Sequence, residues 1–193
     1  MRITTKWTFA GAAVVGLAGC TTTTTKPKLA EASPAAAVSM SPYTWTLGNA
    51  PQAHKDMVAE FGRVGLKPGQ YLWASSIPAE GETRIVIDRL TQMAYVYKAD
   101  ELIGVTTVST AKQGHITPLG QWTILEKRPF YRSKKYDNAP MPWMQRIDEY
   151  GIALHGGGTP GYPESHGCIH LPMKFAEKLY GLTKVGTEVV IEG

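Results

Sequence analysis

A series of short runs rich in β-branched and aromatic residues constrains the fold of this chain more than any other feature. Short runs of this composition are typical of β-strands. Turn signals separate several of them: residues 99–101 have the length of a hairpin turn, and residues 117–120 (TPLG) place Pro and Gly as a type I turn favours. The sequence therefore predicts one mainly β domain, with strands at residues 84–89, 93–98, 102–110, 121–125, 151–154 and 188–191.

Two other segments have apolar side chains at helical spacing. Residues 49–65 predict a short helix with Asn49 as its N-cap and Pro51 in the first turn. Residues 172–181 predict a second helix. Between residues 126 and 150 neither pattern persists, and a connection of that length inside a small domain is usually functional or mobile.

The N-terminal segment has the features of an export signal. Arg2 and Lys6 form a basic start, and the apolar stretch 7–18 is short of the roughly 20 residues that span a bilayer. Small residues then stand directly before Cys20. This arrangement resembles the lipobox of bacterial lipoproteins, in which the matching cysteine becomes the lipidated first residue of the mature chain.

That resemblance implies three acyl chains on Cys20, which satisfies the need for more than one chain in stable anchoring. We therefore expect a lipoprotein held in the cell envelope through Cys20 and facing the periplasm. Thr21 stands where an Asp would signal inner-membrane retention in enteric lipoproteins, so the outer membrane is the preferred location. The alternative is a soluble secreted protein cut at an ordinary small-residue site.

Composition divides the chain into four parts. Residues 1–19 are the predicted signal peptide. Residues 20–50 are rich in Thr, Ala and Pro and predict a flexible tether, because so few large apolar side chains cannot offset the entropy of ordering. Residues 51–80 form a short helical lead-in, and residues 81–193 form the main domain.

Charge and cysteine content exclude two classes of protein. The net charge is +4, of which Arg2 and Lys6 supply half, and duplex binders need several phosphate-neutralising residues on one face. We therefore expect no nucleic-acid partner. Two cysteines cannot form a disulfide framework, and lipidation of Cys20 would leave Cys168 as the one thiol of the mature protein.

The densest reactive chemistry lies between residues 155 and 170 (HGGGTPGYPESHGCIH), where Cys168 stands within a few residues of three histidines. A free thiol has a pKa of about 8.5, so a nucleophilic cysteine needs a base such as imidazole. Glycines in the same segment let backbone N–H groups converge on a developing oxyanion.

Three interpretations of this segment stay open on the residues alone. The first is a cysteine nucleophile with a histidine base. The second is a zinc site, since His166, Cys168 and His170 would share one face of an extended strand and His155 could supply a fourth ligand. The third is a buried cysteine whose neighbouring histidines only cap turns.

The segment also carries a family resemblance. Residues 165–169 (SHGCI), preceded by a strand that ends in His155-Gly156, resemble the active-site signature of the L,D-transpeptidase (YkuD-like) family. Other stretches resemble the family in the same order, and together they cover about two-thirds of the chain. These stretches are residues 85–97, like its opening strands, residues 108–120, like its VSTG…TPxG region, and residues 136–144, like its YxNAPMPYM segment.

The resemblance implies a β-sandwich catalytic domain with a few short helices and no cofactor or metal. Cys168 matches the nucleophile, His155 the general base, and the carbonyl of Gly156 the group that orients the base. Matches to the oxyanion hole come from the backbone N–H groups of His166, Gly167 and Cys168. Ser165 and the His166 side chain would mainly shape the loop, or serve in structural hydrogen bonding alone.

Two departures from the family pattern concern the same segment. His170 stands where members commonly have Arg, which is always charged whereas a histidine is only partly charged near neutral pH. This puts in doubt substrate binding or the orientation of the site. His155 and Cys168 are 13 positions apart, fewer than in many members, which predicts a compact loop between them.

The implied reaction is transpeptidation of peptidoglycan tetrapeptide stems through a cysteine thioester, with release of D-Ala. The acceptor would be a second stem or a protein to be anchored to the wall. Hydrolysis of the same thioester would make the protein an L,D-carboxypeptidase. A lipoprotein that tethers membrane to peptidoglycan without turnover is the alternative from another class.

Substrate contacts are predicted in the segment before the motif. Tyr136, Met141 and Trp143 could line the substrate groove together with His170, or pack as the core of a folded-over loop. Five basic residues precede them and could steer anionic stems toward the site, or form a solvated loop. The five are Lys127, Arg128, Arg132, Lys134 and Lys135.

Overall fold

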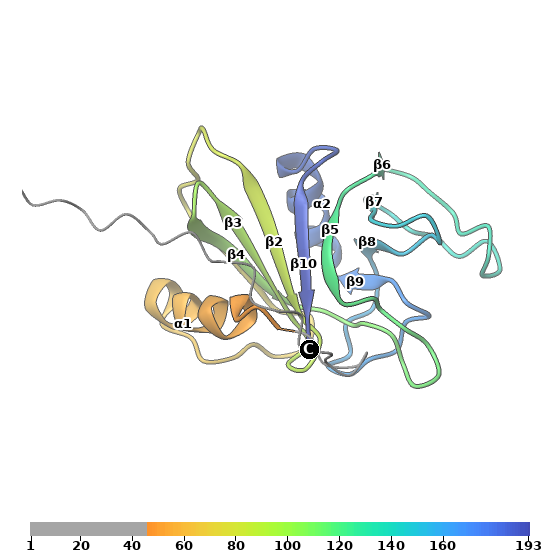
Figure 1. The fold of residues 1–193 in the computed structure, drawn as a ribbon, viewed down its shortest axis with the longest axis horizontal. Helices are drawn as coiled ribbons and strands as arrows, with labels where there is room; N and C mark the ends of the chain where they lie inside the picture. Colours follow the sequence, from red (N-terminus) through yellow and green to blue (C-terminus); the bar gives the residue numbers. More distant parts are fainter. Residues whose placement is uncertain (1–45) are drawn as a thin grey trace, which may run out of the picture. The chain divides into compact units, whose positions relative to one another are not determined.

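Two β-sheets and two helices form the regular structure of residues 46–193, the part of the chain that the computed structural model describes (Figure 1). The predicted signal peptide, the lipid anchor Cys20 and most of the predicted tether lie outside the described residues. The elements are α1 (Asn49–Phe61), β1 (Tyr71–Trp73), β2 (Thr83–Asp88), β3 (Met93–Lys98), β4 (Glu101–Thr107), β5 (Gly120–Thr123), β6 (Glu126–Arg128), β7 (Met144–Arg146), β8 (Ala153–Gly156), β9 (Ile169–Leu171), α2 (Met173–Leu182) and β10 (Glu188–Glu192).

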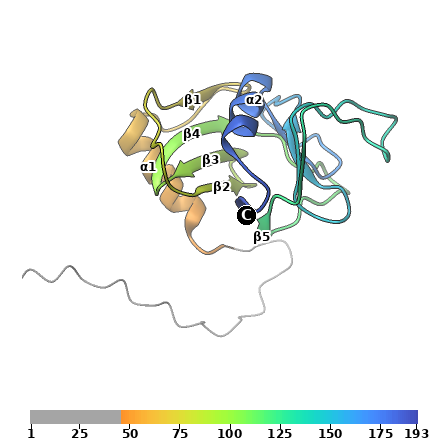
Figure 2. The ribbon, with the colours of Figure 1, turned by 90° about the horizontal axis from the view of Figure 1, so that it is seen from above.

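The larger sheet has six strands in the order β1-β4-β3-β2-β10-β5 (Figure 2). β2, β3 and β4 pair antiparallel as consecutive strands, and β10 inserts between β2, to which it is parallel, and β5. Ala99 and Asp100 connect β3 to β4, and both have positive φ (50° and 66°), as the type I′ hairpin turn requires. The predicted hairpin is therefore confirmed, but its turn is residues 99–100, and Glu101 already pairs with Lys98 as the first residue of β4.

Alternate residues of the larger sheet are buried on its two faces, because each face is covered. In β2, Ile85 and Ile87 face the main core, while Val86 belongs to the cluster under α1, with Met57 of the helix. The main core also contains residues of the second sheet and of α2, including Leu154 and Phe175. The predicted mainly β sandwich with short helices is thus confirmed.

The smaller sheet has the order β6-β7-β8-β9, with β8 and β9 parallel. This pairing sets His155 opposite His170, so the two ends of the motif segment lie side by side. α2 begins directly after β9 and packs on β8. No helix within residues 46–193 is long and apolar enough to cross a membrane.

The sequence patterns missed four short strands. β6 and β7 lie inside the segment expected to lack regular structure, and β1 and β9 have only three residues each, too few for a period of two to be visible. α1 ends at Phe61 rather than at residue 65, because Gly62 adopts the left-handed conformation (φ 62°).

Asn49 is not the N-cap of α1, which corrects the sequence prediction. Gly48 occupies the cap position, and the carboxylate of Glu192 accepts hydrogen bonds from the backbone N–H groups of Leu47 (2.8 Å), Asn49 (3.2 Å) and Ala50 (2.8 Å). The Asn49 side chain donates to the same carboxylate at 3.0 Å. A residue 143 positions away therefore closes the helix, which no local pattern can indicate.

Candidate active site

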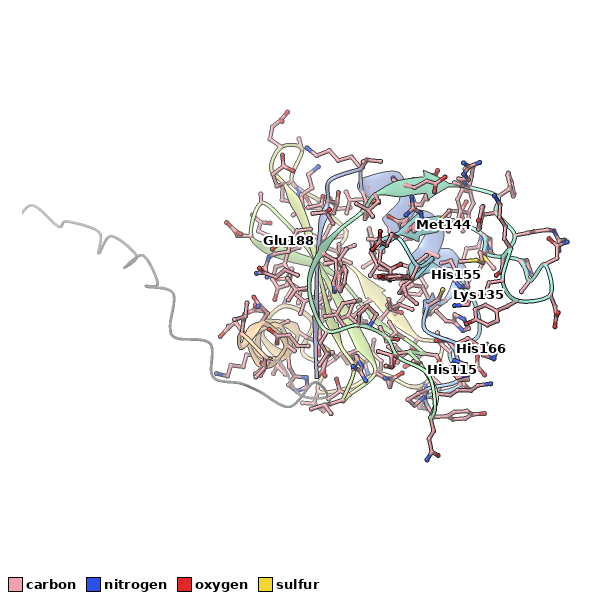
Figure 3. The ribbon with its side chains drawn as sticks, turned by 45° about the vertical axis from the view of Figure 1, so that its right-hand side comes forward. His115, Lys135, Met144, His155, His166 and Glu188 are labelled. Atoms are coloured by element: carbon pink, nitrogen blue, oxygen red, sulfur yellow. The ribbon has the colours of Figure 1, made fainter. Side chains whose placement is uncertain are left out.

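A cavity of about 670 Å³ lies against the smaller sheet and contains both His155 and Cys168 in its wall. Figure 3 shows His155, His166, His115, Lys135 and Met144 on the same side of the domain, with Glu188 apart from them. The wall combines β8, the loop before β9 and the segment between β6 and β8. Its residues are Tyr131, Ser133, Lys134, Lys135, Tyr136, Ala139, Pro140, Met141, Met144, Arg146, Glu149, Tyr150, Gly151, Ile152, His155, Gly156, Gly157, His166, Cys168 and His170.

His155 is held in one tautomer by its neighbour. It lies in β8 with only 6% of its surface exposed, and its Nδ1 is 3.0 Å from the carbonyl oxygen of Gly156. Because a carbonyl only accepts, Nδ1 carries the hydrogen and Nε2 keeps its lone pair. Burial lowers the pKa of His155 to about 4, with the charge of His170 adding to the effect and the Gly156 hydrogen bond opposing it.

Gly156 supplies more than a carbonyl. Its N–H donates to the carbonyl of Pro142 at 2.8 Å, and a Cβ at this position would lie 2.7 Å from Sδ of Met173 and 3.3 Å from the Pro142 ring. A larger residue would therefore displace the strand that carries His155. Close packing explains the glycine here.

Cys168 stands directly before β9 with its thiol partly buried among apolar side chains. Met141, Met144 and Ala153 form the cluster that it packs against, and its Sγ lies 3.7 Å from the carbonyl oxygen of Gly151. Burial raises the pKa of this thiol, the backbone N–H of Ala153 opposes the rise, and Asp148 adds to it. Both Cys168 and His155 are therefore neutral in the resting protein.

The loop before Cys168 is fixed by hydroxyl groups. Ser165 Oγ donates to the carbonyl of Cys168 at 2.6 Å and accepts from the N–H of Gly167 at 3.0 Å. Thr117 Oγ1 donates to the carbonyl of Gly167 at 2.7 Å. Gly167 has φ 134°, and a Cβ there would lie 2.5 Å from Ile152 Cδ1. The hydroxyl of Ser165 thus ties together the backbone of residues 165–168.

One of the three expected oxyanion donors is already engaged in the structure. The N–H of Gly167 is already bound to Ser165 and is not free for a substrate oxygen. Across residues 46–193 no hydrogen bond engages the N–H of His166 or of Cys168. Two of the three expected donors are therefore available.

The His166 ring lies between two other rings. It stacks on Tyr136 (centroids 4.7 Å apart, planes at 22°) and meets His115 edge to face at 4.6 Å. His166 is exposed, and partial loss of solvation lowers the pKa of its ring, with contributions from the charges of Lys112 and His115. The stack joins the loop before Cys168 to the segment between β6 and β7.

The predicted substrate residues divide into two groups. Tyr136, Met141 and His170 line the cavity. Trp143 does not line it: its ring packs against Tyr180 of α2 at 5.4 Å, which is the core role rather than the groove role. Of the aromatic and methionine residues predicted to line the groove, Tyr136 and Met141 therefore line the cavity and Trp143 does not.

The basic segment also divides. Lys127 is fixed at the end of α2, where Nζ donates to the carbonyls of Tyr180 (2.7 Å) and Thr183 (2.5 Å). Arg128 pairs with Glu126 at 2.6 Å, and Arg132 donates to the carbonyl of Asn138 at 2.9 Å. Only two members of the segment line the cavity, and they are Lys134 and Lys135.

The zinc interpretation fails on geometry. Nowhere in the described part of the chain do three or more His, Cys, Asp or Glu side chains converge as ligands of a metal ion. His166 stacks on Tyr136, whereas His170 lies against His155 at 4.9 Å between ring centroids. The histidines are therefore used in separate ring contacts.

The sequence patterns did not indicate three residues that contact the loop before Cys168 or the ring of His170. Thr117 and Ser109 belong to stretches that were noted only for their family resemblance. Their side chains nevertheless hold the loop that precedes Cys168. Ser109 Oγ donates to the Tyr162 carbonyl at 2.8 Å and accepts from the Glu164 N–H at 3.0 Å. Glu164 faces His170 at 3.7 Å. These contacts span up to 55 positions, so spacing in the sequence could not reveal them.

Comparison with known proteins places the chain in a family. The model of the YkuD family, described as the L,D-transpeptidase catalytic domain, matches residues 82–191. The chain belongs to the YkuD family of L,D-transpeptidase catalytic domains. No curated protein gives a match to the chain.

Solved structures give the same fold. An L,D-transpeptidase from Stackebrandtia nassauensis is 28% identical with a TM-score of 0.54, over 62% of this chain and 59% of that one. An L,D-transpeptidase from Mycobacterium smegmatis is 22% identical (TM-score 0.54, 58% and 59% covered). L,D-transpeptidase 3 from Mycobacterium tuberculosis, in complex with a faropenem-derived adduct, is 20% identical (TM-score 0.53, 58% and 60% covered). The chain thus spans less than two-thirds of these relatives.

Proposed function

We propose that this protein is a peptidoglycan L,D-transpeptidase that works through a thioester on Cys168. One observation carries the proposal: a single cavity contains the thiol of Cys168 and the imidazole of His155, whose Nδ1 is fixed on the Gly156 carbonyl. The free Nε2 is then available as a base. Membership of the YkuD family supports this assignment.

In the first half-reaction Cys168 Sγ attacks the carbonyl carbon of the L-centre residue, typically diaminopimelate, of a tetrapeptide stem, while its proton passes to Nε2 of His155. The N–H groups of His166 and Cys168 are suited to the developing oxyanion. The C–N bond to D-Ala then breaks, and His155 returns the proton to the leaving amine. The product is a thioester on Cys168.

In the second half-reaction an amine attacks the thioester, and His155 accepts its proton and passes it to the departing thiolate. The amine belongs to a second stem or to a protein anchored to the wall. Water in its place gives an L,D-carboxypeptidase. Lys134 and Lys135 lie at the cavity, where they can attract carboxylates of the stem.

The site is tested by acylation of the purified domain. A carbapenem is expected to add one adduct mass on Cys168 of the wild type and none on Cys168→Ala. Mass spectrometry of muropeptides after incubation with tetrapeptide stems should show cross-linked dimers with loss of D-Ala. A fully active Cys168→Ala variant would contradict the role of Cys168 as nucleophile. Tripeptide products without cross-linked dimers would show that the protein is an L,D-carboxypeptidase.

We further propose that Cys20 is lipidated and holds the protein in the cell envelope, facing the periplasm, with the outer membrane preferred. The basis is the lipobox resemblance in the sequence. Mass spectrometry of the N-terminal peptide tests it, together with membrane fractionation of wild type and Cys20→Ser. A soluble wild type with an unmodified N-terminus would contradict it.

A further inference from the structure

His170 lies between the proposed base and a carboxylate. The parallel pairing of β8 and β9 sets His170 opposite His155, and their ring centroids are 4.9 Å apart. Nδ1 of His170 also faces Oε1 of Glu164 at 3.7 Å. The three side chains form a row of ionisable groups: His155, His170 and Glu164.

The backbone is built around this row. Ser109 exchanges hydrogen bonds with His170 on both sides, N–H to carbonyl at 3.1 Å and carbonyl to N–H at 2.9 Å, and its hydroxyl accepts from the N–H of Glu164. A Cβ at Gly157 would lie 2.9 Å from Cγ of His170, and one at Gly158 would lie 2.5 Å from Oε1 of Glu164. Two glycines thus leave the space that the row occupies.

The contact between His170 and Glu164 acts through charge. Nδ1 of His170 is buried and has no hydrogen-bond partner within residues 46–193. At 3.7 Å the carboxylate is beyond hydrogen-bond distance but within that of an ion pair. Within this row, the carboxylate of Glu164 is therefore the one negative group that stabilises a positive charge on His170.

We propose that Glu164 is a positioning residue that acts through His170 on His155 and sets the pH below which acylation slows. Its carboxylate favours the cationic ring of His170. A cation at His170 opposes the proton that His155 must accept from the thiol. The inference rests on the proposed function, in which His155 is that base.

The groups around His170 determine the direction in which acylation changes with pH. Burial lowers its pKa below 6.5, Glu164 and the Gly158 backbone oppose this, and His166 adds to it. His155 faces it from β8. Acylation is therefore expected to fall on the acid side of pH 6.5, as His170 becomes charged. Removing the carboxylate of Glu164 should move this fall to lower pH.

The experiment compares wild type, Glu164→Gln, His170→Gln and the double variant, with Glu82→Gln as control. Glu82 also pairs with a cation, Lys184 at 2.9 Å, but does not line the cavity. The readouts are the acylation rate at a saturating carbapenem concentration from pH 4.5 to 8, and the NMR titration of the His170 ring. Near pH 5, Glu164→Gln should acylate about two- to fivefold faster than wild type, with equal rates at pH 7.5.

Glu164→Gln should add nothing in the His170→Gln background, and the control should follow wild type. A uniform loss at all pH values, or an unshifted His170 titration in Glu164→Gln, would overturn the inference while leaving the proposed function standing. Failure of the wild type to form an adduct on Cys168 would overturn the proposed function and this inference with it, even where the His170 titration shifts.

Discussion

The hydroxyl of Thr117 donates to the carbonyl of Gly167 at 2.7 Å, across 50 positions of sequence. The same oxygen accepts the N–H of Ala111 at 3.0 Å, and the side chain is fully buried. One hydroxyl therefore satisfies two backbone groups and fixes the residue before the thiol. The predicted turn at residues 117–120 is not formed, since residues 117–119 are irregular and Gly120 begins β5, but Thr117 holds the loop of the site.

Replacing Thr117 by Val, which keeps the shape, is expected to lower the free energy of unfolding by about 1–3 kcal/mol, because two buried backbone groups lose their partner. Acylation of Cys168 should slow as well, since the loop loses its anchor. Urea unfolding and carbapenem acylation measure the two effects. Thr117→Ser keeps the hydroxyl and should retain most of both; an equal loss in the serine variant would argue against the hydrogen bonds.

Gly167 is expected to tolerate no side chain. Gly167→Ala would place a Cβ 2.5 Å from Ile152 and 3.0 Å from the carbonyl of Ile116, at φ 134°. A loss of about 2–4 kcal/mol in stability and near-complete loss of acylation should follow. Gly181→Ala is the matched control: it lies in α2 with open space around its Cβ position and should stabilise by about 0.5–1 kcal/mol. A well-folded, active Gly167→Ala would contradict the packing argument.

Most of the strands that could be predicted from the sequence belong to the larger sheet; β8 of the smaller sheet was also predicted, and β1 of the larger sheet was missed. In the run at residues 84–89 three consecutive β-branched residues, Ile85 to Ile87, alternate between two covered faces, so composition alone indicates a strand. The strands β6, β7 and β9 have three residues each and owe their pairing to contacts with neighbouring strands. Their stability is tertiary, so the local sequence does not reveal it.

The same division applies to the site. His155, Gly156 and Cys168 stand in a local motif, so the sequence indicates the reactive segment, although residue types alone left three interpretations of it open. The row from His155 to Glu164 and the cap of α1 by Glu192 depend on strand pairing between distant segments. For Trp143 the sequence left a groove role and a core role open, and only its contact with Tyr180 of α2 favours the core role.

His155 should make stability depend on pH. Its folded pKa of about 4 lies below its ordinary value of 6.5, so the unfolded chain binds a proton that the folded chain does not. Stability from this group is complete above pH 6.5 and is lost as pH falls toward 4. The loss in free energy of unfolding caused by His155→Asn should therefore be about 2–3 kcal/mol smaller at pH 4.5 than at pH 7. Urea unfolding at both values checks this, and an equal effect would refute the buried neutral ring.

The basic segment should separate into steering and structural lysines. Neutralising Lys134 and Lys135, which line the cavity, is expected to slow reaction with anionic stems about two- to tenfold at low ionic strength and to flatten the salt dependence. Stability should change little. The measurement is the second-order rate constant for stem peptides between 20 mM and about 500 mM salt, a range over which charges become screened.

Lys127 provides the contrast, because its ammonium group binds the last carbonyls of α2 rather than the cavity. Lys127→Met keeps the aliphatic stem and should lower the free energy of unfolding by about 1–3 kcal/mol, since two backbone carbonyls lose a charged donor. The salt dependence of the rate should match that of wild type. If Lys127→Met flattened the salt dependence as strongly as the double lysine variant, the segment would act as one diffuse patch and the division into two roles would be wrong.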